Sequence, residues 1–175
     1  MNRQELYDLL DSWENIQILI QHLIDHPEQI DLLMDIALND TRKSSWRAAW
    51  LIDKVHEKQA GLIQPYIPEM ILALRSINDD AKKRHFLKLI SLNRLPGQQL
   101  SFLLDFCLNE FTNANQAVAI RVHAMQVLYE ISETEPEFKH ELIQLIGHEI
   151  EYHNSPGISS RGRKLLKKLA VQTKI

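Results

Sequence analysis

Two indoles and a carboxylate form the most distinctive candidate binding group in the sequence. Trp46, Trp50 and Asp53 are spaced i, i+4 and i+7, which places them on one face of an α-helix. Exposed indoles suit partner binding because each buries a large apolar area and also carries a hydrogen-bond donor. The structural alternative is that both tryptophans pack between neighbouring helices. The sequence leaves both interpretations open.

Histidine pairs at two places raise the question of a metal ion. His22 and His26 have the i, i+4 spacing of helical zinc ligands, but Pro27 indicates that the helix ends at His26, so we expect surface histidines. His148 and His153 resemble the H-E-x-x-H zinc motif with one residue too many, which puts them off a common helix face. We therefore predict no metal site.

Other catalytic signatures are missing from the sequence. Cys107 lies among apolar residues, so we expect a buried core thiol and not a nucleophile. The five glycines are isolated, which excludes the glycine-rich loops that bind nucleotide phosphates. We predict no cofactor and no catalytic residue, and we expect a protein without enzymatic activity.

Composition is typical of one folded domain, which we place at residues 1–175. Hydrophobic residues make up 45% and charged residues 25% of the chain. Met1 is followed by polar residues and not by an apolar secretory signal, and the apolar stretches are too short to span a membrane. We expect a cytoplasmic protein.

Charge is unevenly distributed along the chain. Residues before Arg161 include 14 basic and all 23 acidic residues, whereas six basic and no acidic residues follow. Such a basic tail either binds anions or forms the solvated face of a helix. Its residues are Arg161, Arg163, Lys164, Lys167, Lys168 and Lys174.

An internal repeat predicts the elements that position these side chains. Arginines open four predicted helices at spacings of 37, 37 and 40 residues: Arg47, Arg84, Arg121 and Arg161. The positions 17, 14, 13 and 10 residues before each of the first three arginines are apolar and form one helical stripe. They are Ile30, Leu33, Met34, Ala37, Ile67, Met70, Ile71, Leu74, Leu104, Cys107, Leu108 and Phe111.

The pattern predicts an all-α fold of about five stacked helical hairpins. A capping hairpin covers residues 1–26, and repeats cover 27–60, 62–95, 97–133 and 136–172. Prolines fall near the starts of the outer helices, at Pro27, Pro65, Pro96 and Pro136. Asn78 and Asp79 are expected to cap the helix that carries Arg84, and Thr134 with Glu137 has capping-box spacing.

These features resemble HEAT and armadillo-type repeats over roughly residues 27–172. In HEAT repeats the second helix often begins with a Val-Arg-x-x-Ala-like segment after an Asp in the turn. Arg121-Val122-His123-Ala124 is most similar, and Arg47-Ala48-Ala49 after Asp40 is similar too. The resemblance implies a right-handed superhelical solenoid with an Asp–Arg ladder between adjacent repeats.

This resemblance implies a protein-interaction module that binds its partner on a concave face of inner helices. Because the body of the chain is acidic, the first partner to expect is a basic protein segment. Nucleic acid is the alternative partner, because helical-repeat glycosylases for alkylated bases also present tryptophans and an aspartate from inner helices. In that alternative Arg47, Arg84, Arg121 and the basic tail would contact phosphates.

Overall fold

The structure is a computed structural model that describes residues 1–173, and in this range it contains ten α-helices and no strand. The chain forms two compact units, residues 1–89 and residues 90–175, and the boundary falls inside α6. The all-α prediction is therefore confirmed, and the predicted domain and repeat boundaries stay predictions. Lys174 of the basic tail lies outside the described residues.

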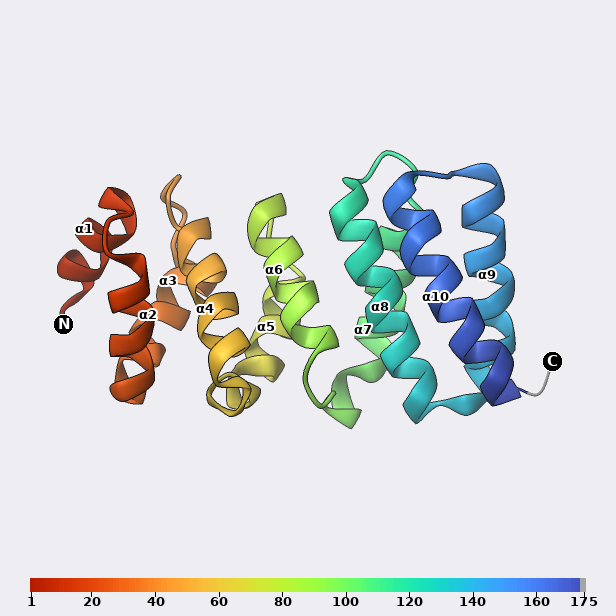
Figure 1. The fold of residues 1–175 in the computed structure, drawn as a ribbon, viewed down its shortest axis with the longest axis horizontal. Coiled ribbons are helices and arrows are strands. Elements are labelled where there is room, and N and C mark those ends of the chain that lie inside the picture. The colour runs from red at the N-terminus through yellow and green to blue at the C-terminus, as the bar shows by residue number, and fades with distance from the viewer. Residues whose placement is uncertain (174–175) are drawn as a thin grey trace. The chain divides into compact units, whose positions relative to one another are not determined.

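The first unit arranges its helices in two layers. Figure 1 shows α2, α4 and α6 in one layer and α1, α3 and α5 in the other. The helices are α1 (Arg3–Ser12), α2 (Ile16–Asp25), α3 (Ile30–Asn39), α4 (Trp46–Lys58), α5 (Ile67–Ala73) and α6 (Asp80–Ser91). Helix α4 packs against α2 and α3 and buries Ala48, Leu51, Ile52 and Val55.

The second unit contains α7 (Leu100–Thr112), α8 (Val118–Thr134), α9 (Lys139–Tyr152) and α10 (Pro156–Thr173). Helix α8 is its centre, because it packs against α7, α9 and α10 and is apolar on most sides. Helix α10 contributes an apolar stripe made of Ile158, Gly162, Leu165 and Leu169. The basic tail is therefore one face of a packed helix.

Short 3-10 turns open the outer helices, a feature that the sequence patterns did not predict. Such turns precede α3, α5, α7 and α9, at Pro27–Gln29, Gln64–Tyr66, Gly97–Gln99 and Pro136–Phe138. A further 3-10 turn spans Ala60–Leu62. Proline at or near the start of a helix loses no hydrogen bond, since the first N–H groups have no partner within the helix.

The helix-start predictions had mixed outcomes. The Asp79 carboxylate accepts a hydrogen bond from the Lys82 amide at 3.0 Å, which confirms it as the cap of α6. The capping box at Thr134 is wrong, because α8 continues through Thr134 and ends there. Glu137 lies instead in the 3-10 turn that follows. Across residues 1–173, no helix combines the length and the apolar composition that a bilayer crossing requires.

Candidate functional site

The three tryptophans of the chain gather in one cluster in the first unit. The Trp13 ring centroid lies 4.7 Å from that of Trp50 and 6.3 Å from that of Trp46. Trp46 and Trp50 come from the first two turns of α4, whereas Trp13 directly follows α1. Helical spacing in the sequence predicted two of the three members, Trp46 and Trp50. Trp13 lies 33 residues before Trp46, so helical spacing could not identify it.

A strained loop holds Trp13 in the cluster. Trp13 and Asn15 have φ values of 58° and 53°, and they are the non-glycine residues with positive φ in the described chain. A bulky residue in this left-handed region costs free energy, so the surrounding contacts must hold it there. The Trp13 amide donates to the Leu9 carbonyl at 3.2 Å, which caps α1.

Arg47 ties this loop to α4. Its Nη1 donates to the carbonyl oxygens of Leu10 and Asp11 at 2.8 and 2.9 Å, at the end of α1. Its guanidinium carbon lies 5.1 Å from the centroid of the Trp13 ring and 6.0 Å from that of the Trp46 ring. A cation at this position stabilises both the helix end and the indole.

The cluster remains partly accessible to solvent. Trp13 is 36% exposed, and Trp46 and Trp50 are half-buried. Lys54 Nζ lies 5.6 Å from the centroid of the Trp50 ring. A shallow hollow beside the cluster has a volume of about 370 Å³ and is lined by Asp11, Lys43, Ser44, Trp46 and Arg47. This arrangement places three indoles and two cationic side chains together at a partly exposed surface.

Asp53 does not belong to this surface. It is 3% exposed, and its carboxylate lies 3.1 Å from His85 Nδ1 and accepts from Lys88 Nζ at 2.9 Å. Burial alone would raise the pKa of Asp53, but the hydrogen bonds from His85 and Lys88 outweigh burial and lower it. The predicted group of two indoles and one carboxylate is therefore divided between a surface cluster and an ion pair joining α4 and α6.

Arg121 is buried, and its side chain donates to three protein groups. Its Nε donates to the Phe111 carbonyl at 2.9 Å, near the end of α7, and its Nη1 donates to the His153 carbonyl at 3.3 Å. Its Nη2 pairs with Glu149 at 2.8 Å, and both side chains are almost completely buried. This geometry fits the structural interpretation of the repeat arginines, because the guanidinium is buried and each of its nitrogens donates to a protein group.

The remaining repeat arginines contact neighbouring side chains. Arg84 Nη2 lies 3.2 Å from His85 Nε2, and Arg161 Nη1 donates to the Gln126 amide oxygen at 2.6 Å. Arg47 and Arg121 do not form the expected ladder with aspartates in the turns. Arg47 bonds to backbone carbonyls, and Arg121 bonds to carbonyls and Glu149.

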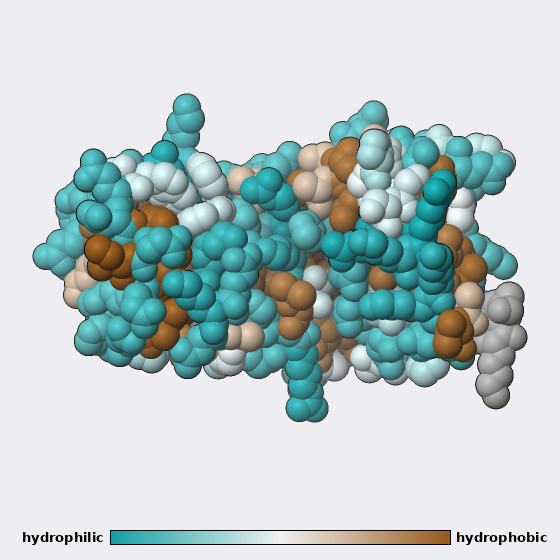
Figure 2. Space-filling model, viewed as in Figure 1, coloured by the Kyte–Doolittle hydropathy of each residue, from teal (hydrophilic) through white to brown (hydrophobic). Residues whose placement is uncertain are grey.

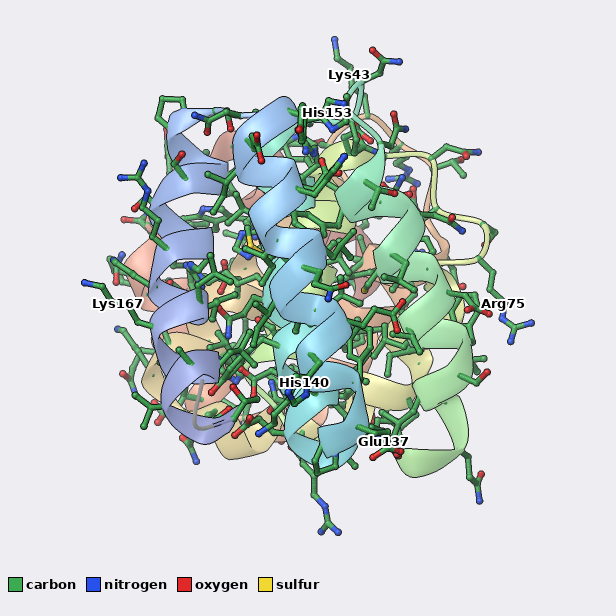
Figure 3. The ribbon with its side chains drawn as sticks, turned by 90° about the vertical axis from the view of Figure 1, so that its right-hand side faces the viewer. Lys43, Arg75, Glu137, His140, His153 and Lys167 are labelled. Carbon is green, nitrogen blue, oxygen red and sulfur yellow. The ribbon has the colours of Figure 1, made fainter. Side chains whose placement is uncertain are left out.

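The basic residues of α10 differ in their surroundings. Arg163, Lys164, Lys167 and Lys168 are exposed, whereas Arg161 is half-buried. Figure 3 shows Lys167 pointing away from the helices. Lys168 Nζ lies 5.4 Å from the centroid of the Tyr129 ring of α8. These residues lie opposite the buried apolar stripe of α10. They form a solvated helix face, which was one of the two interpretations of the basic tail.

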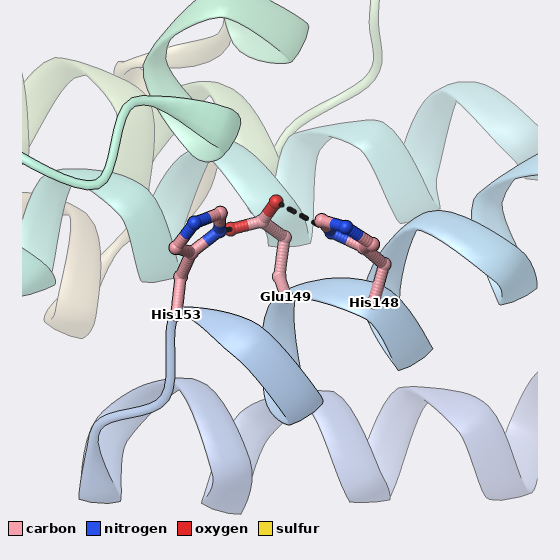
Figure 4. Close-up of side chains that lie close together, drawn as sticks. All are labelled: His148, Glu149 and His153. Carbon is pink, nitrogen blue, oxygen red and sulfur yellow. Dashed lines mark hydrogen bonds and ion pairs between the residues drawn. The ribbon is translucent and has the colours of Figure 1, made fainter.

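A second group of side chains meets at the end of α9, contrary to the argument from spacing. His148 Nδ1 and His153 Nδ1 lie 3.3 and 3.0 Å from the two carboxylate oxygens of Glu149 (Figure 4). The premise was wrong because His153 is not helical: α9 ends at Tyr152, and His153 has φ −129° and ψ 42°. Residues five apart can approach each other once the second has left the helix.

Cys107 is completely buried, as expected for a core thiol. Burial raises the pKa of this thiol far above its ordinary range, so the nucleophilic thiolate form is suppressed.

A family model for the HEAT repeat domain matches residues 3–169. The chain belongs to this family. No curated protein and no solved structure matches the chain. The resemblance seen in the arginine-containing segments is thus confirmed, and the match begins before the first of those segments. In this HEAT repeat protein the tryptophan cluster lies on the first and second hairpins, where α1, α2 and α4 meet.

Proposed function

We propose that this HEAT repeat protein is a non-enzymatic interaction module that binds a protein partner through Trp13, Trp46 and Trp50. The observation that supports the proposal is the gathering of all three tryptophans in one partly exposed cluster. Aromatic anchors of this kind dominate the binding energy of many protein interfaces. The positive φ of Trp13 is a further reason, because strained residues concentrate at functional sites.

Apolar burial is the main source of affinity in this proposal. Lys54 and Arg47 lie beside the indoles, and the exposed acidic residue Asp11 lines the neighbouring hollow, so the local charge is mixed. Figure 2 shows a largely hydrophilic surface with separate apolar patches, one of them over α2. Ile18 of α2 is 69% exposed. A basic partner remains an expectation from the acidic composition, and affinity that falls steeply with added salt would support it.

The base-excision alternative has no comparable support from the geometry. It requires an accessible carboxylate beside the tryptophans, and Asp53 is buried against His85 and Lys88. It also requires arginines free to hold phosphates, whereas Arg47 and Arg121 are bonded to helix-end carbonyls. We therefore propose a protein partner and no nucleic acid.

The test is affinity capture of partners by the tagged protein and three variants, from lysate with and without nuclease. Trp13→Gly removes one indole without backbone strain, since glycine adopts positive φ freely. Trp50→Ala removes the second, and Leu72→Ala is the control because Leu72 is an exposed apolar residue of α5, outside the cluster. Circular dichroism checks that each variant keeps its helices.

We expect a nuclease-resistant protein partner that Leu72→Ala retains and that both tryptophan variants lose by about tenfold or more, as hot-spot truncation does. Equal capture by all four proteins would contradict the proposed surface. Recovery that depends on nucleic acid would replace the protein partner with the nucleic-acid alternative.

A further inference from the structure

The end of α9 brings together three side chains of the kinds that bind transition metals. One potential ligand atom from each of His148, Glu149 and His153 lies within 4.8 Å of the other two. The carboxylate is at the centre, with one imidazole nitrogen near each of its oxygens, as Figure 4 shows. Two imidazoles and one carboxylate are the protein ligands of many zinc sites with an open coordination position.

Two of the spacings between these atoms are close to those in a four-coordinate site. With metal–ligand bonds of about 2.0–2.1 Å, tetrahedral ligands lie about 3.3–3.4 Å apart. His148 Nδ1 lies 3.3 Å from Glu149 Oε1 and His153 Nδ1 lies 3.0 Å from Glu149 Oε2, and the three ligand atoms lie within 4.8 Å of one another, so the rings must turn to bring all three atoms to this spacing. His148 and His153 are 54% and 38% exposed, so their rings have room to turn toward a shared ion.

Arg121 gives the carboxylate a fixed position. Its Nη2 holds Glu149 Oε2 at 2.8 Å, while Oε1 faces His148. Partners that orient a ligating carboxylate are a regular part of metal sites. Glu149 is 2% exposed, and a buried carboxylate of this kind cannot turn away into solvent.

The helix end adds a second favourable interaction. Carbonyl groups at the end of α9 carry the partial negative charge of the helix dipole, which stabilises a cation within the last turn. Glu149 lies in that turn, and His153 immediately follows the helix. The positive charge of Arg121 opposes the ion, but it is already compensated by Glu149 and by the carbonyls of Phe111 and His153.

We propose that His148, Glu149 and His153 bind a divalent transition-metal ion of the zinc class, with a coordination position left open to solvent. The site lies in the second unit and shares no residue with the tryptophan cluster. It is independent of the proposed partner surface, so either proposal can fail without the other.

The experiment titrates tag-free protein with ZnCl₂ by isothermal titration calorimetry, and with CoCl₂ while visible absorption is recorded. The variants are His148→Ala and His153→Ala, and the matched control is His140→Ala. His140 is an exposed histidine at the opposite end of α9 (Figure 3). Because His148 is largely exposed, its variant is expected to fold, and circular dichroism verifies this.

We expect one Zn²⁺ per chain and Co²⁺ absorption bands of a four-coordinate site. His148→Ala and His153→Ala should each weaken Zn²⁺ binding by more than about tenfold, while His140→Ala leaves it unchanged. The proposal is overturned if the wild-type protein gives no saturable binding. It is equally overturned if both site variants bind as the wild type does, which would place the ion elsewhere, for example at His22 and His26.

Discussion

Asp40, in the turn between α3 and α4, is the residue whose environment has the clearest thermodynamic consequence. Its carboxylate lies 3.2 Å from Arg3 Nη2 of α1 and accepts from the Arg42 amide at 2.8 Å. Burial opposes ionisation, but these groups and the Tyr7 hydroxyl outweigh burial and lower the pKa of Asp40 to about 2. The ionised carboxylate thus stabilises the fold.

Replacing Asp40 by Asn should make the free energy of unfolding less dependent on pH in the acidic range. A carboxyl whose pKa is depressed by folding stabilises the protein above its unfolded pKa of about 3.9, and this contribution disappears as the pH falls toward 2. We expect Asp40→Asn to lower the free energy of unfolding at pH 7 by on the order of 2 kcal/mol, and the difference from wild type to shrink between pH 4 and 2. Urea unfolding at several pH values measures it.

The matched control for this prediction is Asp105→Asn, since Asp105 is an exposed aspartate of α7. We expect its difference from wild type to stay near zero throughout the pH range. A difference for Asp40→Asn that persists unchanged at pH 2 would show that the carboxylate charge is not the source of the stability.

Single residues also show what the sequence could and could not predict. The regular spacing of Arg47, Arg84 and Arg121 predicted equivalent positions near helix starts, and the contacts of Arg47 and Arg121 with helix ends agree with it. Trp13 was missed, and His153 was named but wrongly placed away from His148, because both residues lie just outside helices. Helical periodicity gives no direction to a side chain in a loop, where the local φ and ψ decide it.

At the scale of elements, α9 and α10 approach closely at a glycine. A Cβ added to Gly162 of α10 would lie 2.9 Å from Ile150 Cδ1 and 3.1 Å from Ile146 Cγ2. The Ile146 atom is a branch on a stiff side chain that is fully buried, so it cannot move away cheaply. Gly147, in the middle of α9, has nothing within 4 Å of such a Cβ.

These two glycines should therefore respond oppositely to alanine. Gly147→Ala is expected to raise the free energy of unfolding by about 0.5–1 kcal/mol, because alanine loses less backbone entropy in a helix. Gly162→Ala has the same favourable backbone entropy, but its Cβ overpacks the interface at a cost of about 1–3 kcal/mol. We therefore expect a net loss of stability. Thermal and urea unfolding of both variants decide the matter. Stabilisation by both substitutions would show that the interface between α9 and α10 has spare room.

The sequence predicted helices better than their ends. Apolar stripes at i, i+3, i+4 and i+7 located α3 and α5, whose predicted stripe residues are buried. In α7 the predicted residues Leu104 and Leu108 are only half-buried, while the neighbouring Leu103 is fully buried. The stripe there is rotated because tertiary packing, not periodicity alone, selects the face that is buried. The 3-10 turns at the prolines have no hydrophobic period and gave no signal.

At the scale of the whole molecule, a HEAT repeat protein is stabilised by contacts between sequence neighbours, so damage should remain local. Arg121 provides a test because it is buried in the second unit and joins α7, α8 and α9 through Phe111, Glu149 and His153. Removing it leaves the Glu149 carboxylate buried without its cation. Breaking a buried pair in this way costs about 3–5 kcal/mol.

We expect Arg121→Ala to increase hydrogen–deuterium exchange throughout α7 to α10 and to change exchange in α1 to α4 much less. Local opening follows the stability of each region. The described side-chain hydrogen bonds of Arg121 go to α7, α9 and His153, and none of them goes to α1 to α4.

Arg121→Met combined with Glu149→Leu serves as the control, because replacing both charges by apolar groups removes the uncompensated carboxylate. That variant should recover most of the protection in α7 to α10. An equal increase of exchange in α1 to α4 would mean that the two units unfold together, and that cooperativity extends through α6, where they are joined.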